Sequence, residues 1–127
     1  MHPNEQVLRD LDAAQMKGDV ESFSGYFTDD VIIHVPGKSS FAGVHKGKDQ
    51  FLELFGRFLE RTPEYTFEPH AYLADDEHGV TLQHSHYKRG SETLDDDDTF
   101  VCHFRDGKVS EIWLLSQDQE AVDTFLG

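Results

Sequence analysis

The chain of 127 residues is poor in cysteine, in basic side chains and in long apolar runs, and each shortage excludes something. Its one cysteine, Cys102, excludes an internal disulfide and any metal site built from several cysteines. No apolar run approaches the roughly 20 residues that a membrane-spanning helix needs. The start, MHPNEQVLRD, has no basic segment followed by an apolar one, so we expect no secretion signal and a cytoplasmic protein.

Basic residues are strongly outnumbered, because 11 Lys and Arg stand against 25 Asp and Glu, a formal net charge of −14. A field of this sign repels phosphate backbones, which argues against nucleic acid as a partner. The length and the even composition predict a single domain over residues 1–127, large enough to bury a core without disulfides. Aromatic residues make up 12% of the chain, enough to build a core and also the walls of a pocket.

Apolar side chains recur at helical spacing in the first half of the chain. Residues 4–17, 19–27 and 49–61 each show this pattern, and the third is strongly amphipathic. Gly18 suits the end of the first helix, and Pro63 terminates the third. These patterns predict three helices before the middle of the chain.

From Tyr65 onward the apolar period changes to two, which is typical of strands. Tight turns are predicted at residues 75–79, where Gly79 is available for a positive φ, and at Asp106-Gly107. The predicted strands are 31–35, 65–74, 80–89, 99–105 and 108–116, and a last short helix covers 118–126. This order predicts an α+β fold with the helices on one face of a curved sheet.

The two faces of the last hairpin are both largely apolar. A two-residue turn at Asp106-Gly107 pairs Val101 with Ile112. One face then carries Thr99, Val101, His103, Ile112 and Leu114, and the other carries Phe100, Cys102, Phe104, Val109, Glu111, Trp113 and Leu115. The helices can cover only one face. We therefore expect a homodimer through the second face, with Phe100, Phe104 and Trp113 in the interface.

The element order and three stretches resemble the SnoaL-like branch of the nuclear-transport-factor-2-like superfamily. The stretches are FTDDVIIHVPGKSSFAGVHKGKDQF, FVCHFRDGKVSEIW and SQDQEAVDTFL. The resemblance implies a cone-shaped domain whose curved, mixed, mostly antiparallel sheet wraps around the N-terminal helices and a central pocket. The superfamily includes isomerases, cyclases, epoxide hydrolases, dehydratases and proteins without catalysis, so the fold alone does not select a chemistry.

The catalytic carboxylates that the resemblance implies are absent here. Ketosteroid isomerases carry a general base just before a proline at the end of the first strand, and that position is Val35. Polyketide cyclases of this branch carry a catalytic aspartate on the last strand, where this chain has Leu114. Limonene-type epoxide hydrolases use an aspartate at about the position of Leu114. They also use an Arg and an Asp on a middle strand, where this chain has His84 and His86, and an Asn on the first strand, where it has His34. None of the three mechanisms transfers intact.

Histidines are the remaining candidates for acid/base catalysis, because their unperturbed pKa lies near 6.5. His84 and His86 share one face of their strand, and His103 lies on the hairpin face assigned inward. The resemblance turns His34 toward the same pocket. The alternative for each is a hydrogen-bonded structural role. Two same-face histidines and a third could also bind Zn²⁺, but no carboxylate has a fixed spacing to them, so we assign no metal and no cofactor.

The pocket wall is expected to be aromatic and aliphatic. The predicted ligand-binding residues are His103, Tyr26, Phe27, Phe41, Phe55, Phe58, Leu59, Val101, Ile112 and Leu114. The run Asp95–Asp98 is interpreted as a solvated acidic loop, since consecutive residues cannot converge on one ion. Lys46 and Lys48 precede a helix and could bind an anion, although Gly47 as a helix N-cap explains the pattern equally well.

These residues lead to a first hypothesis of a small-molecule pocket protein. It would act as an isomerase, cyclase or hydrolase on an apolar carbonyl or epoxide metabolite, with histidine as the acid/base group. The loss of carboxylates at Val35 and Leu114 favours a non-catalytic ligand-binding or carrier domain instead. A third hypothesis is a dimeric interaction module whose core is filled.

Overall fold

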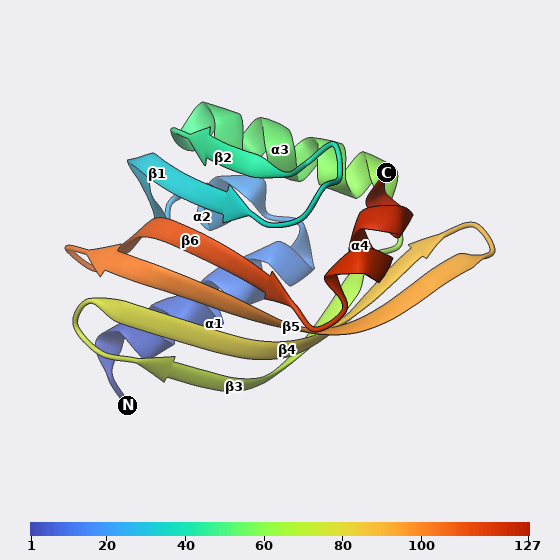
Figure 1. Ribbon diagram of the computed structural model, residues 1–127. Helices are drawn as coiled ribbons and strands as arrows, with labels where there is room; N and C mark the ends of the chain where they lie inside the picture. Colours follow the sequence, from blue (N-terminus) through green and yellow to red (C-terminus); the bar gives the residue numbers. More distant parts are fainter.

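The computed structural model describes residues 1–127 as four helices and one curved sheet of six strands (Figure 1). The elements are α1 (Pro3–Lys17), α2 (Val20–Ser24), β1 (Phe27–Val35), β2 (Gly43–Lys46), α3 (Lys48–Arg61), β3 (Thr66–Ala74), β4 (His78–Arg89), β5 (Glu92–Arg105), β6 (Lys108–Ser116) and α4 (Gln119–Leu126). The strand order is β2-β1-β6-β5-β4-β3, with β1 parallel to β6 and all other neighbours antiparallel. The predicted α+β class and the mixed, mostly antiparallel sheet are confirmed. No helix combines the length and apolar character that crossing a bilayer would require.

The helices begin and end where local chemistry dictates. Gly18 follows α1 in the left-handed conformation, with φ at 71°. The side chain of Asp19 accepts the Ser22 N–H at 3.1 Å and caps α2, and Asp118 accepts the Ala121 N–H at 3.1 Å and caps α4. At the start of α3, Gly47 is the N-cap, as one of the two interpretations of that stretch had it.

Two parts of the sheet differ from the prediction. Strand β1 begins at Phe27 and not at the predicted residue 31, so Thr28–Asp30 belong to the strand. Strand β2 was not predicted. Its four residues are too few to show a hydrophobic period. The strand is stabilised by antiparallel pairing with β1, in which Ile33 lies opposite His45.

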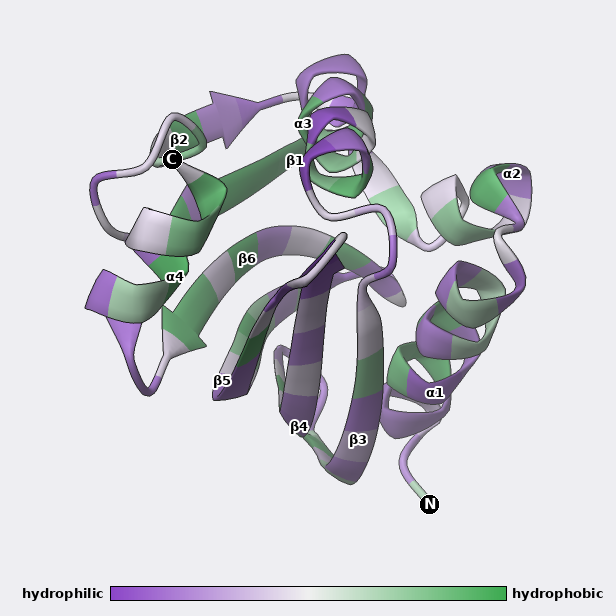
Figure 2. Ribbon diagram, turned by 90° about the vertical axis from the view of Figure 1, so that its right-hand side faces the viewer, coloured by the Kyte–Doolittle hydropathy of each residue, from purple (hydrophilic) through white to green (hydrophobic).

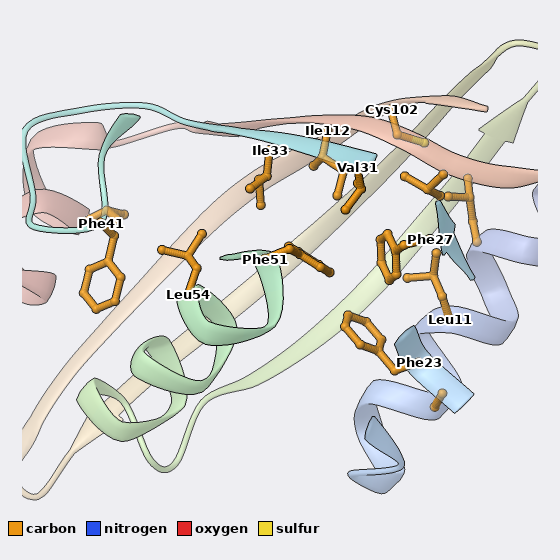
Figure 3. Close-up of a cluster of buried hydrophobic side chains, with 14 of the residues drawn as sticks. Leu11, Phe23, Phe27, Val31, Ile33, Phe41, Phe51, Leu54, Cys102 and Ile112 are labelled. Carbon is orange, nitrogen blue, oxygen red and sulfur yellow. The ribbon is translucent and has the colours of Figure 1, made fainter. Parts of the chain in front are cut away.

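The helices lie on the concave side of the sheet (Figure 2). Helix α1 packs on β3 and β4, α3 on β1 and β2, and α4 on β5 and β6. Figure 3 shows the buried side chains where these layers meet, with Phe27 between the helices and the sheet. Its ring centroid lies 5.0 Å from that of Phe23 and 4.7 Å from that of Phe51. This aromatic cluster joins α2, β1 and α3.

The hairpin of β5 and β6 turns at Asp106-Gly107 as predicted, but its register is shifted by a bulge. Phe104 pairs with Val109, and the next pair is His103 with Glu111, so Ser110 has no partner. The extra residue reverses the faces of β6 relative to the predicted register. The expected pairing of Val101 with Ile112 is therefore wrong, since Val101 pairs with Trp113.

The inner face of the hairpin consequently differs from the predicted one. Its residues are Phe100, Cys102, Phe104, Val109, Ile112 and Leu114. The expectation that Phe100 and Phe104 lie in a dimer interface is wrong, because both pack against the interior. Trp113 does lie on the outer face, as predicted.

Gly79 is required for packing and not for a turn. It lies in β4 without a positive φ, where a Cβ would come within 2.7 Å of Phe104 Cε2 and 2.8 Å of Cys102 Sγ. We expect Gly79→Ala to lower the free energy of unfolding by about 1–3 kcal/mol through overpacking, as measured by urea denaturation. The control is Gly56→Ala in α3, which meets nothing within 4 Å and should stabilise by about 0.5–1 kcal/mol. Equal stability of Gly79→Ala and the unmodified chain would contradict this account.

Candidate functional site

A cavity of about 170 Å³ lies between the concave face of the sheet and the helices. Of its 25 lining residues 16 are hydrophobic, so a bound molecule must be mainly apolar. The aromatic wall consists of Phe23, Phe27, Phe41, Phe51, Phe55, Phe58, Tyr65, Tyr87 and Phe100. The aliphatic and proline lining is Leu11, Ile33, Val35, Pro36, Leu54, Leu114, Val122 and Leu126. The polar lining is Asp12, Gln15, Ser39, Thr81, Gln83, Asp98, Ser116 and Gln119.

A second, more open hollow borders this cavity beside α2. Gln15, Phe23, Phe55 and Tyr65 line both spaces, so these four side chains lie between them. Exposed apolar side chains surround this hollow, namely Met16, Val20 and Leu59. The hollow is therefore the natural entrance for an apolar molecule.

The carboxyl of Asp98 is the polar centre of the sheet side of the cavity. Its Oδ1 accepts a hydrogen bond from Ser85 Oγ at 2.8 Å, and its Oδ2 accepts one from Gln83 Nε2 at 3.2 Å. Ser85 has one proton and donates it to Asp98, so the Tyr65 hydroxyl, 2.8 Å away, donates to Ser85. Burial raises the pKa of Asp98 to about 6. The hydrogen bonds from Ser85 and Gln83 lower it, but by less than burial raises it.

A second carboxyl, that of Asp12, enters the cavity from α1. It is 7% exposed, and its Oδ2 accepts a hydrogen bond from the Tyr72 hydroxyl at 2.8 Å. Burial raises the pKa of Asp12 to about 6 as well. Outside the cavity, the guanidinium of Arg9 lies over the ring of Tyr72, 4.6 Å from its centroid.

The two tyrosines of the wall remain neutral hydrogen-bond donors. Burial raises the pKa of Tyr65, and the negative charges of Asp98 and Asp12 raise it further. Burial also raises the pKa of Tyr87, with Tyr65 and Asp98 adding to the effect. The field of both carboxylates thus reaches the Tyr65 hydroxyl. No Lys, Arg or His lines the cavity to balance them.

The histidines predicted as catalytic lie on the opposite, outer face of the sheet. His84 Nδ1 is 3.0 Å from Asp97 Oδ1, and His86 Nδ1 is 2.8 Å from Asp95 Oδ1. His84 also contacts Asp95, with Nε2 3.2 Å from Oδ1, and its own hydrogen bonds to Asp97 and Asp95 raise the pKa of His84. The expectation that His84 and His86 face the pocket is wrong. The alternation of β4 correctly separated its two faces. However, the face with Ser85 is the one that turns inward, and the face with His84 and His86 is exposed.

His34 and His103 also lie on the outer face, so their predicted inward orientation is wrong too. His34 Nε2 is 2.7 Å from Glu111 Oε2, and its ring is stacked on Trp113 with centroids 4.9 Å apart. His103 contacts the same indole edge-on, with centroids 4.8 Å apart. The structural interpretation of His34 is the one that this geometry favours.

The predicted pocket wall is placed only in part as expected. Phe27, Phe41, Phe55, Phe58 and Leu114 line the cavity, and their contact with a ligand remains a prediction. The other predicted wall residues do not line it. Leu59 borders the entrance hollow, Tyr26 and Ile112 pack in or against the core, and Val101 faces outward.

The acidic run is the feature that the sequence interpretation missed. Asp95–Asp98 do not form a solvated loop, because they lie within β5. Strand alternation turns Asp96 and Asp98 inward and leaves Asp95 and Asp97 outside. The stretch SETLDDDDTF shows no apolar alternation that would have revealed the backward extension of β5. No group of three or more His, Cys, Asp or Glu side chains is arranged to hold a metal ion.

The comparisons with known proteins agree with this architecture. The family model of the SnoaL-like domain matches residues 8–112, and the chain belongs to this family. The structure is similar to Bal32a, from a soil-derived mobile gene cassette, with 28% identity over 98% of this chain and 97% of that one and a TM-score of 0.92. It is also similar to a cystatin-like-fold protein of unknown function from Xanthomonas campestris, with 25% identity over 100% and 99% of the two chains and a TM-score of 0.91.

A third similar structure shares the fold alone. It is a putative SnoaL-like polyketide cyclase from Jannaschia, with 14% identity over 98% of this chain and 91% of that one and a TM-score of 0.82. No curated protein matches the chain in sequence. The resemblance to the SnoaL-like branch is confirmed. Val35 and Leu114, where the resemblance implies the catalytic carboxylates of ketosteroid isomerases and polyketide cyclases, both line the cavity here as apolar residues.

The raised pKa of Asp98 makes a prediction about stability. Between about pH 4 and pH 6 the folded chain retains a proton that the unfolded chain has lost, so the stabilisation falls as pH rises through about 6. Asp98→Asn removes this penalty. We expect it to match the unmodified chain near pH 4 and to exceed its free energy of unfolding at pH 8 by roughly 1–3 kcal/mol.

The matched control is Asp97→Asn, which removes the same charge from the next residue, on the outer face. It should show no gain at pH 8. Urea denaturation at both pH values measures the effect, and a difference independent of pH would show that the carboxyl of Asp98 is not buried in its charged form.

Proposed function

We propose that this SnoaL-like domain binds a small, mainly apolar molecule in its cavity and that Asp98 transfers a proton to or from it. The reaction classes that this supports are isomerisation, cyclisation and hydrolysis by acid/base catalysis. The observation that carries the proposal is a carboxyl held by two donors inside a mainly apolar, aromatic cavity. Asp98 thereby takes the role that the sequence assigned to histidine.

The surroundings of Asp98 suit proton transfer near neutral pH. A general acid or base works best when its pKa lies near the working pH, and burial brings the pKa of Asp98 to about 6. Ser85 and Gln83 fix the orientation of the carboxyl. Tyr65 supplies a neighbouring hydroxyl that stays protonated and supports Ser85.

The size of the cavity limits the bound molecule. An apolar cavity of about 150 Å³ is large enough to hold benzene, so the present one suits a ligand with one ring and a short substituent. The similar fold of a putative polyketide cyclase is in keeping with an organic substrate. The entrance hollow beside α2 provides a route for its binding.

A non-catalytic carrier or binding domain is the second candidate. The observation that favours it is that Val35 and Leu114 place only apolar groups in the cavity at the family's carboxylate positions. In that case Asp98 would serve only as a hydrogen-bonding anchor for the ligand. Binding without any proton transfer would distinguish this candidate from the first.

The proton-transfer proposal can be tested with 5-nitrobenzisoxazole, a small, neutral, aromatic probe that opens when a base removes its ring proton. Asp98 would take the proton from carbon as the N–O bond breaks, releasing 2-cyano-4-nitrophenolate, which is followed by its visible absorbance. We expect activity that rises as pH increases through about 6, where Asp98 ionises.

Asp98→Asn should lower kcat/KM at least tenfold, in line with the roughly 10²- to 10⁴-fold contribution of a general base. The control is again Asp97→Asn, which should retain activity. Unchanged turnover by Asp98→Asn would remove Asp98 from this role. Saturable binding of the probe without turnover by the unmodified protein would favour the carrier function.

We also propose that the outer face of the sheet joins two copies of the chain. It presents Trp113, flanked by the rings of His34 and His103, together with Leu115, which is 52% exposed. Large exposed apolar groups on a sheet face are typical of an interface. Phe100 and Phe104, which the sequence had assigned to it, are not part of this surface.

A charge at Leu115 tests the dimer. The unmodified protein should sediment as a dimer, and Leu115→Glu should sediment as a monomer because a carboxylate cannot be desolvated against the second copy. Val20→Glu, at an equally exposed position on the helical side, should remain dimeric. A monomeric unmodified protein at micromolar concentration would overturn the proposal.

A further inference from the structure

The carboxylate of Asp12 has no role in the proton transfer proposed for Asp98, although it is the more deeply buried of the two. Its Oδ2 is occupied by the Tyr72 hydroxyl, whereas its Oδ1 has no hydrogen-bond partner in the protein. This oxygen is not sealed in the core, since Asp12 lines the cavity. Asp98, by contrast, has a donor on each oxygen. Asp12 is therefore the carboxylate with a free acceptor site for a ligand.

The charged residues that line the cavity all have one sign. They are Asp12 and Asp98, and both act on Tyr65. Two guanidiniums lie behind wall or neighbouring rings and do not line the cavity: Arg9 is over the ring of Tyr72, 4.6 Å from its centroid, and Arg57 is over the ring of Phe41, 4.9 Å from its centroid. With a net charge of −14, the whole chain attracts cations and repels anions. A buried carboxylate without a cationic partner is costly, and a cationic ligand would supply one.

The cavity that Asp12 enters also has aromatic walls. Leu11, which precedes Asp12 in α1, lies next to Phe23 and Phe27 (Figure 3), and all of these residues line the same cavity as Asp12. The ring of Phe23 is 5.2 Å from that of Phe55, so aromatic faces continue from this point into the cavity. Aromatic faces attract ammonium groups, more strongly when water is excluded. Carboxylate and aromatic rings together favour an amine over an alcohol or an acid of the same shape.

We propose that the ligand of this cavity carries a protonated amine on an apolar, ring-sized body, and that Asp12 binds the ammonium group through its free Oδ1. This inference rests on the proposed function, because it names the class of molecule on which Asp98 would act. The two carboxylates then divide the work. Asp12 positions the ligand, and Asp98 exchanges the proton.

Three probes of nearly equal shape test the proposal, namely 2-phenylethylamine, 2-phenylethanol and phenylacetate. Calorimetry at pH 8 should show that the amine binds at least tenfold more tightly than the alcohol and that phenylacetate does not bind. Like a lysine side chain, the amine stays protonated up to roughly pH 9. Its affinity should therefore fall as pH decreases through about 6, where Asp12 takes up a proton, while the affinity of the alcohol stays constant.

Asp12→Asn should bring amine and alcohol to within about threefold of each other. The control is Asp10→Asn, which removes the same charge from the same helix, where Asp10 accepts only from Gln6 on the surface. It should keep the tenfold preference. Asp98 also ionises at about pH 6, so if Asp12→Asn does not fold, the amine preference and its pH dependence are measured in Asp98→Asn, where both should persist if Asp12 is their source and disappear if Asp98 is.

The outcomes separate this inference from the proposed function. Equal or tighter binding of the alcohol by the unmodified protein overturns the amine inference and leaves the small-molecule cavity in place. A preference for the amine that survives in Asp12→Asn overturns the role of Asp12. Failure of all three probes to bind, together with no reaction of 5-nitrobenzisoxazole, overturns both the inference and the proposed function.

Discussion

Successive aspartates occupy the middle of β5, and strand geometry sends their carboxylates to opposite faces of the sheet. The distribution of polar groups across the domain depends on this constraint. On the outer face, Asp95 and Asp97 lie within hydrogen-bonding distance of His86 and His84. On the inner face, Asp98 is held by donors from β4. Asp96, which is 4% exposed, accepts the backbone N–H of Asp118 at the start of α4.

The inner half of this arrangement explains why a cavity exists at that point. A charged group buried among apolar side chains is tolerated when donors surround it, and Ser85 and Gln83 provide them. Filling the space with another apolar side chain would bury the carboxyl further and leave these two donors as its only partners. The domain instead keeps a hollow in which a ligand can complete the hydrogen bonding. The unpartnered oxygen of Asp12 on the facing helix follows the same logic.

The outer half gives the histidines a physical role different from the one expected of them. The exposed imidazole of His84 is easier to protonate because its hydrogen bonds to Asp97 and Asp95 raise its pKa, and in the charged form it offsets part of the negative charge of β5. His34 and His103 pack on Trp113 at the centre of the same face. These residues belong to a surface and not to a catalytic site. The bulge at Ser110 is what turns Trp113 toward them.

Local sequence determined the helices, their caps, the turn at Asp106-Gly107 and the α+β order, because each depends on neighbours within a few residues along the chain. The resemblance carried by three stretches correctly placed these elements in a SnoaL-like cone. Which face of β4 and β6 turns inward was decided only by tertiary structure. A period of two shows which residues share a face of a strand, but not which face turns inward. In β6, a single unpaired residue, Ser110, exchanges the inward and outward faces relative to the predicted register. The burial of the Asp12 and Asp98 carboxyls was likewise decided only by tertiary structure, since burial is a property of the packed layers and not of the residue itself.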